Sequence, residues 1–428
     1  MRRVTRYRGI FLALILFSCV LPTYVSGAEL QIKSDTILRL FQRDTATTDD
    51  ATVLPGYEYL QVDAGHLSDY GVSFHLYGWG RNDFADNDYY ENQTAGELLY
   101  GYMEYRQEAN RFNAKLGRFQ VFSGVANDAV DGLYLSGDLG DYFDLSLYGG
   151  QPGALDSEQG RSGDSIYGGR LAHHLGTHYE VGVSYKSIDN DHDKTAEMIG
   201  VDMSLFLPAN IGLYGYSAYN NETDDWAEHS YELRIPVGKV TIKPFYQHFT
   251  YEGYFDTGAS AVNPFRWLSQ TGEKLSTYGV DALWQINTNW TLGGKVKIFD
   301  HDKIDNAETY SAQLTWQGDG LTQYGGEIGH TSASDTADND YTLVRLFGYC
   351  DAMAGQFWLD FVSADMLMTF YKNDIYSEDS SFFASLGTGK RFLNDALSVT
   401  LSGDYSQDPY FDDDLRGMLT MSYAYDKQ

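Results

Sequence analysis

The chain has 428 residues, with 30 Lys+Arg against 60 Asp+Glu, a formal net charge of −30 and 35 tyrosines. A balance this acidic excludes the basic surface that nucleic-acid binding requires. The sequence has two cysteines, and it has no C-x-x-C-H haem motif, C-x-x-C pair or zinc-ligand spacing.

Residues 1–27 are predicted to be a secretory signal peptide. Four arginines precede an apolar core at Ile10–Phe17, which is about half the length needed to span a bilayer. Small residues place the cleavage after Gly27 or Ala28. The alternative is a lipobox ending at Cys19, although Phe17 fits that motif poorly. The mature chain, residues 28–428, is expected to be one domain.

From about residue 30 onward, short runs alternate apolar and polar residues. After Val240, for example, Ile242 and Tyr246 fall on one face, while Lys243 and Gln247 fall on the other. Alternation of period two indicates strands whose faces meet different environments. With a secretory signal in front, this pattern predicts an all-β, antiparallel, up-and-down transmembrane β-barrel in the cell outer membrane.

The connections between these runs alternate between short turns and long acidic segments. Ten short and eleven longer connections predict about 22 strands, within a range of 18–22, and place both termini on the short-turn side. Short turns of such barrels are periplasmic and long loops extracellular. The apolar stretch Met366–Tyr371, inside one expected loop, predicts either an extra strand or an extension. A soluble β-sandwich or β-propeller is the alternative, but it does not explain the strict alternation of short and long connections along the chain.

The long connections contain most of the acidic residues, as in Asn82–Asn92, Asp189–Asp193 and Ser334–Asp340. Such clusters are able to share Ca²⁺ or Mg²⁺ with lipopolysaccharide phosphates. The run DNDHD superficially resembles a calcium loop, but Lys194 stands where that loop has glycine. A solvated loop is therefore preferred over a dedicated metal site, and no resident cofactor is expected.

If the apolar face of each strand meets lipid, the other face lines a lumen with a relative excess of basic residues. Charges facing lipid cost roughly 2–4 kcal/mol at the midplane, so inward placement is expected. These charges either give the pore some selectivity or pair with one another and stiffen the wall. The residues predicted to line the pore are Arg39, Arg81, Lys115, Arg118, Asp131, Arg170, Arg234, Lys243, Lys295, Lys297, Arg345, Asp360 and Arg391.

One local pattern resembles a known family. Lys115–Gln120 (KLGRFQ) followed by Asp131–Leu133 (DGL) is similar to the "LGRQ…DGL" strand pair of Gram-negative substrate-type porins. It also resembles the roughly 400-residue barrels of metal-reducing deltaproteobacteria, some of which sheathe porin–cytochrome conduits. Here Phe119 stands where many relatives have Gln. Gly117 is expected to form a bulge that turns Arg118 inward, to pair with the Asp of the second strand.

The chain end also departs from that family. Many such barrels end in an aromatic residue that the assembly machinery reads, whereas Asp426, Lys427 and Gln428 follow Tyr425 here. Recognition of the last strand is therefore less certain than in those relatives.

Three functions are compared. A porin for passive, weakly selective passage of small hydrophilic solutes or ions needs only an open, charged lumen. Phe265, Arg266 and Trp267 are the candidates for a loop that folds inward as a constriction. The alternative is a barrel sheath that holds separate multihaem cytochromes, with haem supplied only by those partners. An enzyme is not expected, because no G-x-S-x-G or convincing nucleophile–histidine spacing is present.

Overall fold

The computed structural model describes residues 29–43, 51–85, 89–108, 111–153, 163–251, 272–303, 305–332, 340–351, 358–409 and 411–427. No helix within these ranges is long and apolar enough to cross a membrane. The strands are β1 Glu29–Arg43, β2 Ala51–Val53, β3 Pro55–Gly65, β4 Gly71–Asp83, β5 Thr94–Arg106, β6 Phe112–Ser123, β7 Ala126–Asp138, β8 Phe143–Pro152, β9 Ser165–Leu175, β10 Tyr179–Asn190, β11 Asp193–Leu207, β12 Ile211–Asn220, β13 Asp225–Val237, β14 Val240–Thr250, β15 Lys274–Gln285, β16 Trp290–His301, β17 Ala307–Gln317, β18 Gln323–Ser332, β19 Tyr341–Cys350, β20 Phe361–Ile375, β21 Glu378–Phe392, β22 Leu397–Asp408 and β23 Phe411–Lys427, with a 3-10 turn, η2, at Pro208–Asn210.

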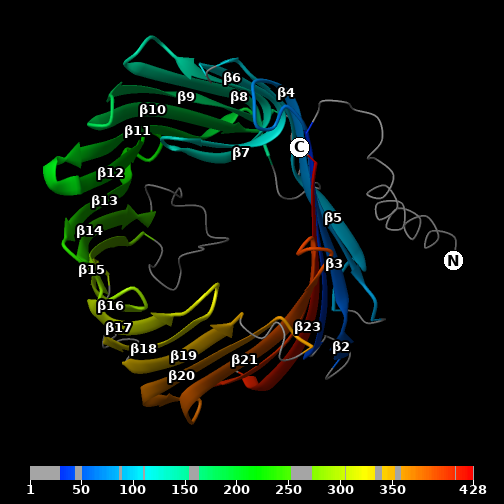
Figure 1. The fold of residues 1–428 in the computed structure, drawn as a ribbon. Coiled ribbons are helices and arrows are strands. Elements are labelled where there is room, and N and C mark those ends of the chain that lie inside the picture. Colours follow the sequence, from blue (N-terminus) through cyan, green and yellow to red (C-terminus); the bar gives the residue numbers. More distant parts are fainter. Residues whose placement is uncertain are drawn as a thin grey trace, which may run out of the picture.

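The strands close into a single antiparallel barrel (Figure 1). From β3 to β23 each strand pairs with the next one in sequence, and β1 closes the barrel between β3 and β23, pairing with β23 from Leu30–Lys427 to Leu40–Gly417. Of the 23 strands, β2 only adds a three-residue pairing to the end of β1, which leaves 22 in the wall. The prediction of an all-β barrel of about 22 strands is confirmed.

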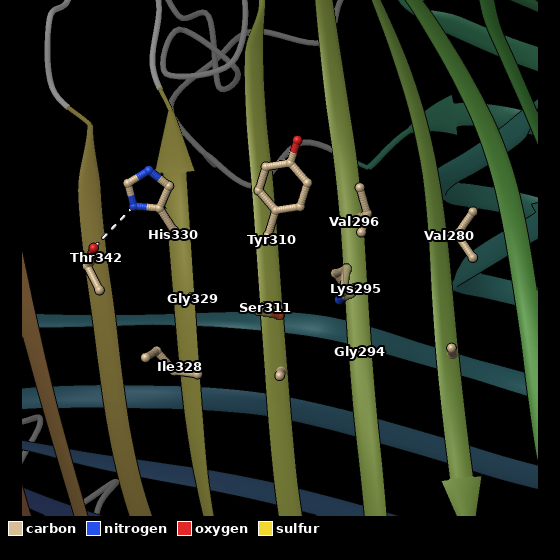
Figure 2. Close-up of a pocket in the computed structure, with 12 residues that line it drawn as sticks. Val280, Gly294, Lys295, Val296, Tyr310, Ser311, Ile328, Gly329, His330 and Thr342 are labelled. Carbon is tan, nitrogen blue, oxygen red and sulfur yellow. Dashed lines mark hydrogen bonds between the residues drawn. The ribbon is translucent and has the colours of Figure 1, made fainter.

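The predicted alternation appears as two chemically different faces. On β15, β16 and β18 the side chains of Val280, Val296 and Ile328 point outward and are 41%, 39% and 57% exposed. Figure 2 shows this apolar outer surface, where small residues such as Gly294 leave a shallow hollow between the larger side chains. An exposed apolar band is unfavourable in water, so the outer face is suited to lipid.

Several outer connections are shorter than expected, because the strands continue through them. The expected acidic loop Asp189–Asp193 is a hairpin in which β10 and β11 are joined by Asp191 and His192 alone. Both residues have positive φ, 50° and 72°, as two-residue hairpin turns require. The stretch Met366–Tyr371 is not an extra strand but the middle of β20.

Candidate functional site

The inner face of the barrel lies opposite the exposed apolar side chains. In the strand register Lys243 lies beside Asp281, and Asp281 beside Lys295, so one charged row crosses β14, β15 and β16. Ten residues predicted to line a pore occupy inner-face positions by the same register: Arg39, Arg81, Lys115, Arg170, Arg234, Lys243, Lys295, Lys297, Arg345 and Arg391.

The other predicted positions behave differently. Asp360 lies just before β20, and its carboxylate accepts a hydrogen bond from the backbone N–H of Arg391 at 2.6 Å. It therefore ties the end of β21 to the preceding connection rather than standing on a strand face. The predicted constriction at Phe265, Arg266 and Trp267 lies outside the described residues.

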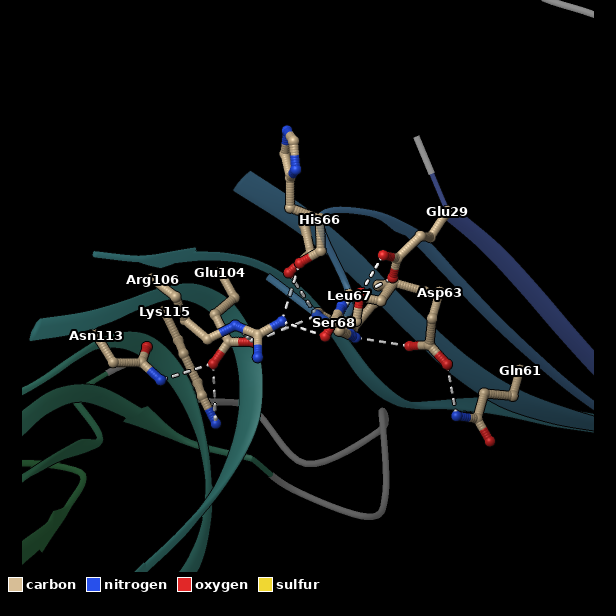
Figure 3. Close-up of polar contacts among 12 residues, drawn as sticks. Glu29, Gln61, Asp63, His66, Leu67, Ser68, Glu104, Arg106, Asn113 and Lys115 are labelled. Atoms are coloured by element: carbon tan, nitrogen blue, oxygen red, sulfur yellow. Dashed lines mark hydrogen bonds and ion pairs between the residues drawn. The ribbon is translucent and has the colours of Figure 1, made fainter. Parts of the chain in front are cut away.

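One sector of the inner face, on β3–β6, is a dense polar network (Figure 3). The Glu104 carboxylate accepts a hydrogen bond from Asn113 at 2.7 Å and lies 4.0 Å from the Lys115 ammonium. His75 lies 2.6 Å from Asp63 and 3.4 Å from Glu104. Charges arranged in this way compensate one another and stiffen the wall. Similar pairs occur at Arg170 with Asp202 and Glu180, Arg345 with Asp365, and Arg391 with Asp351.

A second sector, on β13–β16, carries cations without such partners. Among the described residues, Arg234, Lys243, Lys295 and Lys297 make no ion pair or hydrogen bond, although Lys297 lies 5.5 Å from the ring centre of Phe245. Glu232 and Asp281 share this face and offset the positive charge in part, and the remaining positive charge on the wall of a water-filled lumen attracts anions. The inner face therefore combines a self-neutralised sector with a cationic one.

The hairpin formed by β6 and β7 leaves the wall and enters the lumen. Along its described length, β6 pairs with β5 only where Asn113–Arg118 faces Gly101–Arg106, and beyond that it pairs with β7 alone. Gly117 lies at the divergence with φ of 127°, and a Cβ there would be 2.3 Å from the Gly101 carbonyl oxygen. The close approach requires glycine. Figure 1 shows β7 on the inner side of the neighbouring strands.

An apolar cluster holds the hairpin against the inner wall. Phe119, Val121 and Val130 of the hairpin are at most 1% exposed, and they pack with Tyr148 of β8 and Ile166 of β9. Fully burying side chains of this size is worth about 1.5–3 kcal/mol each. The hairpin is therefore packed against the wall as a fixed internal element.

The hairpin tip is held by polar contacts as well. The backbone N–H of Val125 donates to the Ser184 hydroxyl at 3.0 Å, and the Lys186 ammonium donates to Asp128 at 3.0 Å. Both wall partners belong to the inner face of β10. The Val125 side chain also packs with the buried residues Met198, Ala218 and Ala227.

The pair expected from the sequence, Arg118 with Asp131, forms at the divergence. The Arg118 Nε and Nη2 donate to the two Asp131 carboxylate oxygens at 2.6 and 2.8 Å. Its Nη1 donates to the carbonyl of Leu98 on β5 at 2.9 Å. The expected bulge at Gly117 is wrong, because β6 keeps its register with β5 and β7 through this residue. Arg118 and Asp131 therefore keep the strand parity of the exposed residues Leu116 and Leu133, and the pair forms on the outward side of the two strands.

The inward hairpin was not predicted from the sequence. The sequence indicated only that a connection joins the runs Lys115–Gln120 and Asp131–Leu133, whereas in the structure just Gly124 and Val125 separate the two strands. The sequence did carry one signal of the inward course: the segment 121–126 (VFSGVA) contains no acidic residue, unlike the other outer connections. An apolar hairpin tip indicates contact with protein rather than exposure to solvent.

Among the residues that the structure describes, no group of three or more His, Cys, Asp and Glu is arranged to hold a metal ion. The acidic segment Ser334–Asp340, named above as a possible divalent-cation site, is described only at Asp340.

No family model and no curated protein matches this chain. Solved structures do match. The usher PapC in an E. coli P pilus tip assembly intermediate has a TM-score of 0.56 at 10% identity, over 95% of this chain and 62% of that chain. OccAB2 of Acinetobacter baumannii has a TM-score of 0.47 at 8% identity, over 95% of this chain and 100% of that one. OpdK of Pseudomonas aeruginosa has a TM-score of 0.46 at 10% identity, over 95% of this chain and 100% of that one. At these identities the likeness to PapC shows the fold alone, that of a large β-barrel.

Proposed function

We propose that this chain is an outer-membrane porin for passive passage of small hydrophilic solutes, with a preference for anions. The inner face carries the proposal, because the cations of β13–β16 have no ionic partners among the described residues. The β6–β7 hairpin supports the proposal as well, because an element packed against the inner wall narrows the lumen, as a pore for small solutes requires. The outer apolar band supports a membrane location, and the predicted signal peptide supports export to the outer membrane.

The hairpin also bears on the alternative of a sheath around multihaem cytochromes. A sheath needs a lumen free to accept another folded chain, and the hairpin occupies part of that space. We therefore prefer the porin. Purification from native membranes checks this choice, because a stoichiometric haem absorption band that follows the barrel would favour the sheath.

The selectivity is measurable as a reversal potential across a planar bilayer under a KCl gradient. We expect the purified barrel to prefer chloride, and the double substitution Lys243→Gln with Lys295→Gln to lower the chloride-to-potassium permeability ratio by about twofold or more, because two positive charges leave the wall. Lys239→Gln is the matched control, since Lys239 lies in the β13–β14 turn and donates to the Ile286 carbonyl.

A barrel that does not conduct would refute the porin. A conducting barrel whose selectivity is unchanged by the double substitution would refute the role given to the β13–β16 cations.

A further inference from the structure

We propose that the inner wall at the junction of β1, β3, β22 and β23 holds a carbohydrate-binding site, in which uncharged sugar rings stack on aromatic side chains. The site names a class of solute for the proposed porin, and as a step in solute passage it rests on that function. The inference is carried by a cavity, by a band of aromatic side chains beside it, and by two charged groups without ionic partners in the described part of the chain.

The cavity lies where β1 ends and β23 begins. Its volume is about 500 Å³, within the roughly 300–1,000 Å³ of sites for small molecules. Arg39 and Ile37 share the inner face of β1, and the strand register pairs Met418 with Arg39 and Tyr57 with Ile37. The Arg39 guanidinium lies 5.5 Å from the Tyr57 ring centre. Because Arg39, Tyr57 and Met418 all line the cavity, it belongs to the lumen side of the wall.

Aromatic rings form much of the cavity wall and hold one another in place. The ring centres of Phe41 and Tyr89 are 5.7 Å apart, and those of Tyr89 and Tyr90 are 4.8 Å apart. The Tyr57 and Tyr90 hydroxyls are hydrogen-bonded at 3.1 Å, and the Arg81 guanidinium lies 3.7 Å from the Tyr90 ring centre. Rings fixed in this way bind a flat ligand at a low cost in conformational entropy, and their negative faces attract the C–H groups of a sugar ring.

A band of inner-face aromatic residues continues from Tyr57 across β3, β4 and β5. Each of these residues is partly exposed. Ring centres lie 5.4–6.5 Å apart in the pairs Tyr57–Trp79, Tyr59–Tyr77, Tyr77–Tyr100 and Tyr100–Tyr102. Stacking surfaces repeated along a wall suit a chain of sugar units better than a single small ion.

The charged groups of the cavity favour an uncharged solute. Arg43 and Arg416 both donate to the Asp414 carboxylate, at 2.7 and 2.6 Å. Arg39 and Asp404 also line the cavity, and neither makes an ion pair or hydrogen bond within the described ranges. A guanidinium only donates hydrogen bonds and an ionised carboxylate only accepts them, whereas a sugar hydroxyl does both. Sugar hydroxyls therefore match the two groups together, while a ligand of a single charge is repelled by one of them.

Saturation-transfer NMR on the full barrel tests the proposal, with the protein purified in dodecyldimethylamine oxide, a detergent without sugar groups. Maltotriose and cellotriose are titrated separately, and we expect at least one of them to bind, with its ring C–H protons most strongly saturated. Arg39→Gln and Asp404→Asn are each expected to weaken that binding about tenfold, because each removes a charged partner for the sugar hydroxyls.

Lys33→Gln is the matched control, since Lys33 is an exposed cation on the same face of β1, six positions before Arg39. It should leave sugar binding unchanged, and all variants must keep the heat-resistant folded band on gels. The proposal fails if neither trisaccharide binds, if both cavity substitutions leave binding unchanged, or if the control weakens it equally. Tighter binding of benzoate or L-lysine than of the sugars would overturn the assignment of an uncharged ligand.

Conductance of the same preparations in a planar bilayer separates this proposal from the porin function. A barrel that binds sugar but does not conduct would refute the porin alone. A barrel that conducts but binds neither trisaccharide would refute the carbohydrate site alone.

Discussion

At the scale of single residues, the charged side chains divide by whether they hold the protein together or face the lumen. Asp128 and Lys186 belong to the first group, because their side chains are only 21% and 11% exposed and their contact joins the hairpin to the wall. Lys243 and Lys295 belong to the second group, because no ion pair within the described part of the chain uses them. The alternation of the sequence assigned these two lysines to the polar face, but it did not show which charges find partners, since partners depend on which strands meet in space.

Asp128→Asn is expected to loosen the hairpin tip. The substitution removes the negative charge next to a largely buried lysine, which should cost about 1–3 kcal/mol of stability. The midpoint of unfolding in denaturant measures the loss, and single-channel recordings should show a noisier or larger conductance. Glu197→Gln is the control, because Glu197 pairs with the exposed Lys194. Equal effects of both variants would contradict the special role of Asp128.

The pH dependence of stability includes a contribution from Glu29, the first residue of β1, at the short-turn end of the barrel. Hydrogen bonds from the Ser68 hydroxyl and backbone N–H hold the pKa of the Glu29 carboxyl below its usual 4.5. The ionised form is favoured by folding, so the stabilisation is present above pH 4.5 and is lost as the pH falls through the lowered pKa.

Glu29→Gln should therefore be less stable than the unsubstituted protein at pH 7, and the difference should be smaller at pH 3, where the carboxyl is more protonated. Thermal unfolding at both pH values provides the measurement. A difference that persists undiminished at the lower pH would show that the carboxylate is not its source.

At the scale of elements, the β6–β7 hairpin separates what the sequence predicts from what it does not. The two strands were predicted from alternation and from the similarity of the segments around Gly117 and Gly132 to the porin pattern. The inward course of the hairpin was not predicted, because it depends on contacts between residues far apart in the sequence. Val125 and Ser184 of β10, for example, are 59 positions apart. Alternation reports which face of a strand is apolar, and it carries no information on where a hairpin tip docks.

Gly200→Leu is expected to displace the hairpin tip. A Cβ at Gly200 would lie 2.3 Å from the Val125 Cγ1 atom, so the tip must move away from β11. Such overpacking should cost about 1–3 kcal/mol and push the tip further into the lumen. The single-channel conductance should fall. Gly417→Leu is the control, because a Cβ there meets no atom within 4 Å. An unchanged conductance in Gly200→Leu would mean that the hairpin does not limit the pore.

At the scale of the whole molecule, alternation was sufficient for the fold class. Each strand is apolar on one side only, and a chain of such strands satisfies its backbone only by closing, as β1 and β23 do here. The parity of short and long connections gave the strand number, although hairpins such as β10–β11 continue beyond the expected loop boundaries. The constriction at Phe265–Trp267 stays a prediction, and the β6–β7 hairpin is an inward element that the connection pattern did not reveal.

Closure of the barrel gives the last prediction, which concerns the chain end. β23 continues past the aromatic residue Tyr425, and Asp426 and Lys427 pair with Gln31 and Leu30 of β1. Removing the last three residues deletes two of the eleven register pairs between these strands and leaves nine. Refolding into detergent should therefore be nearly unchanged. Heat-resistant folded protein on gels measures the yield, and a marked fall would show that the pairs of Asp426 and Lys427 with β1 are needed to close the barrel.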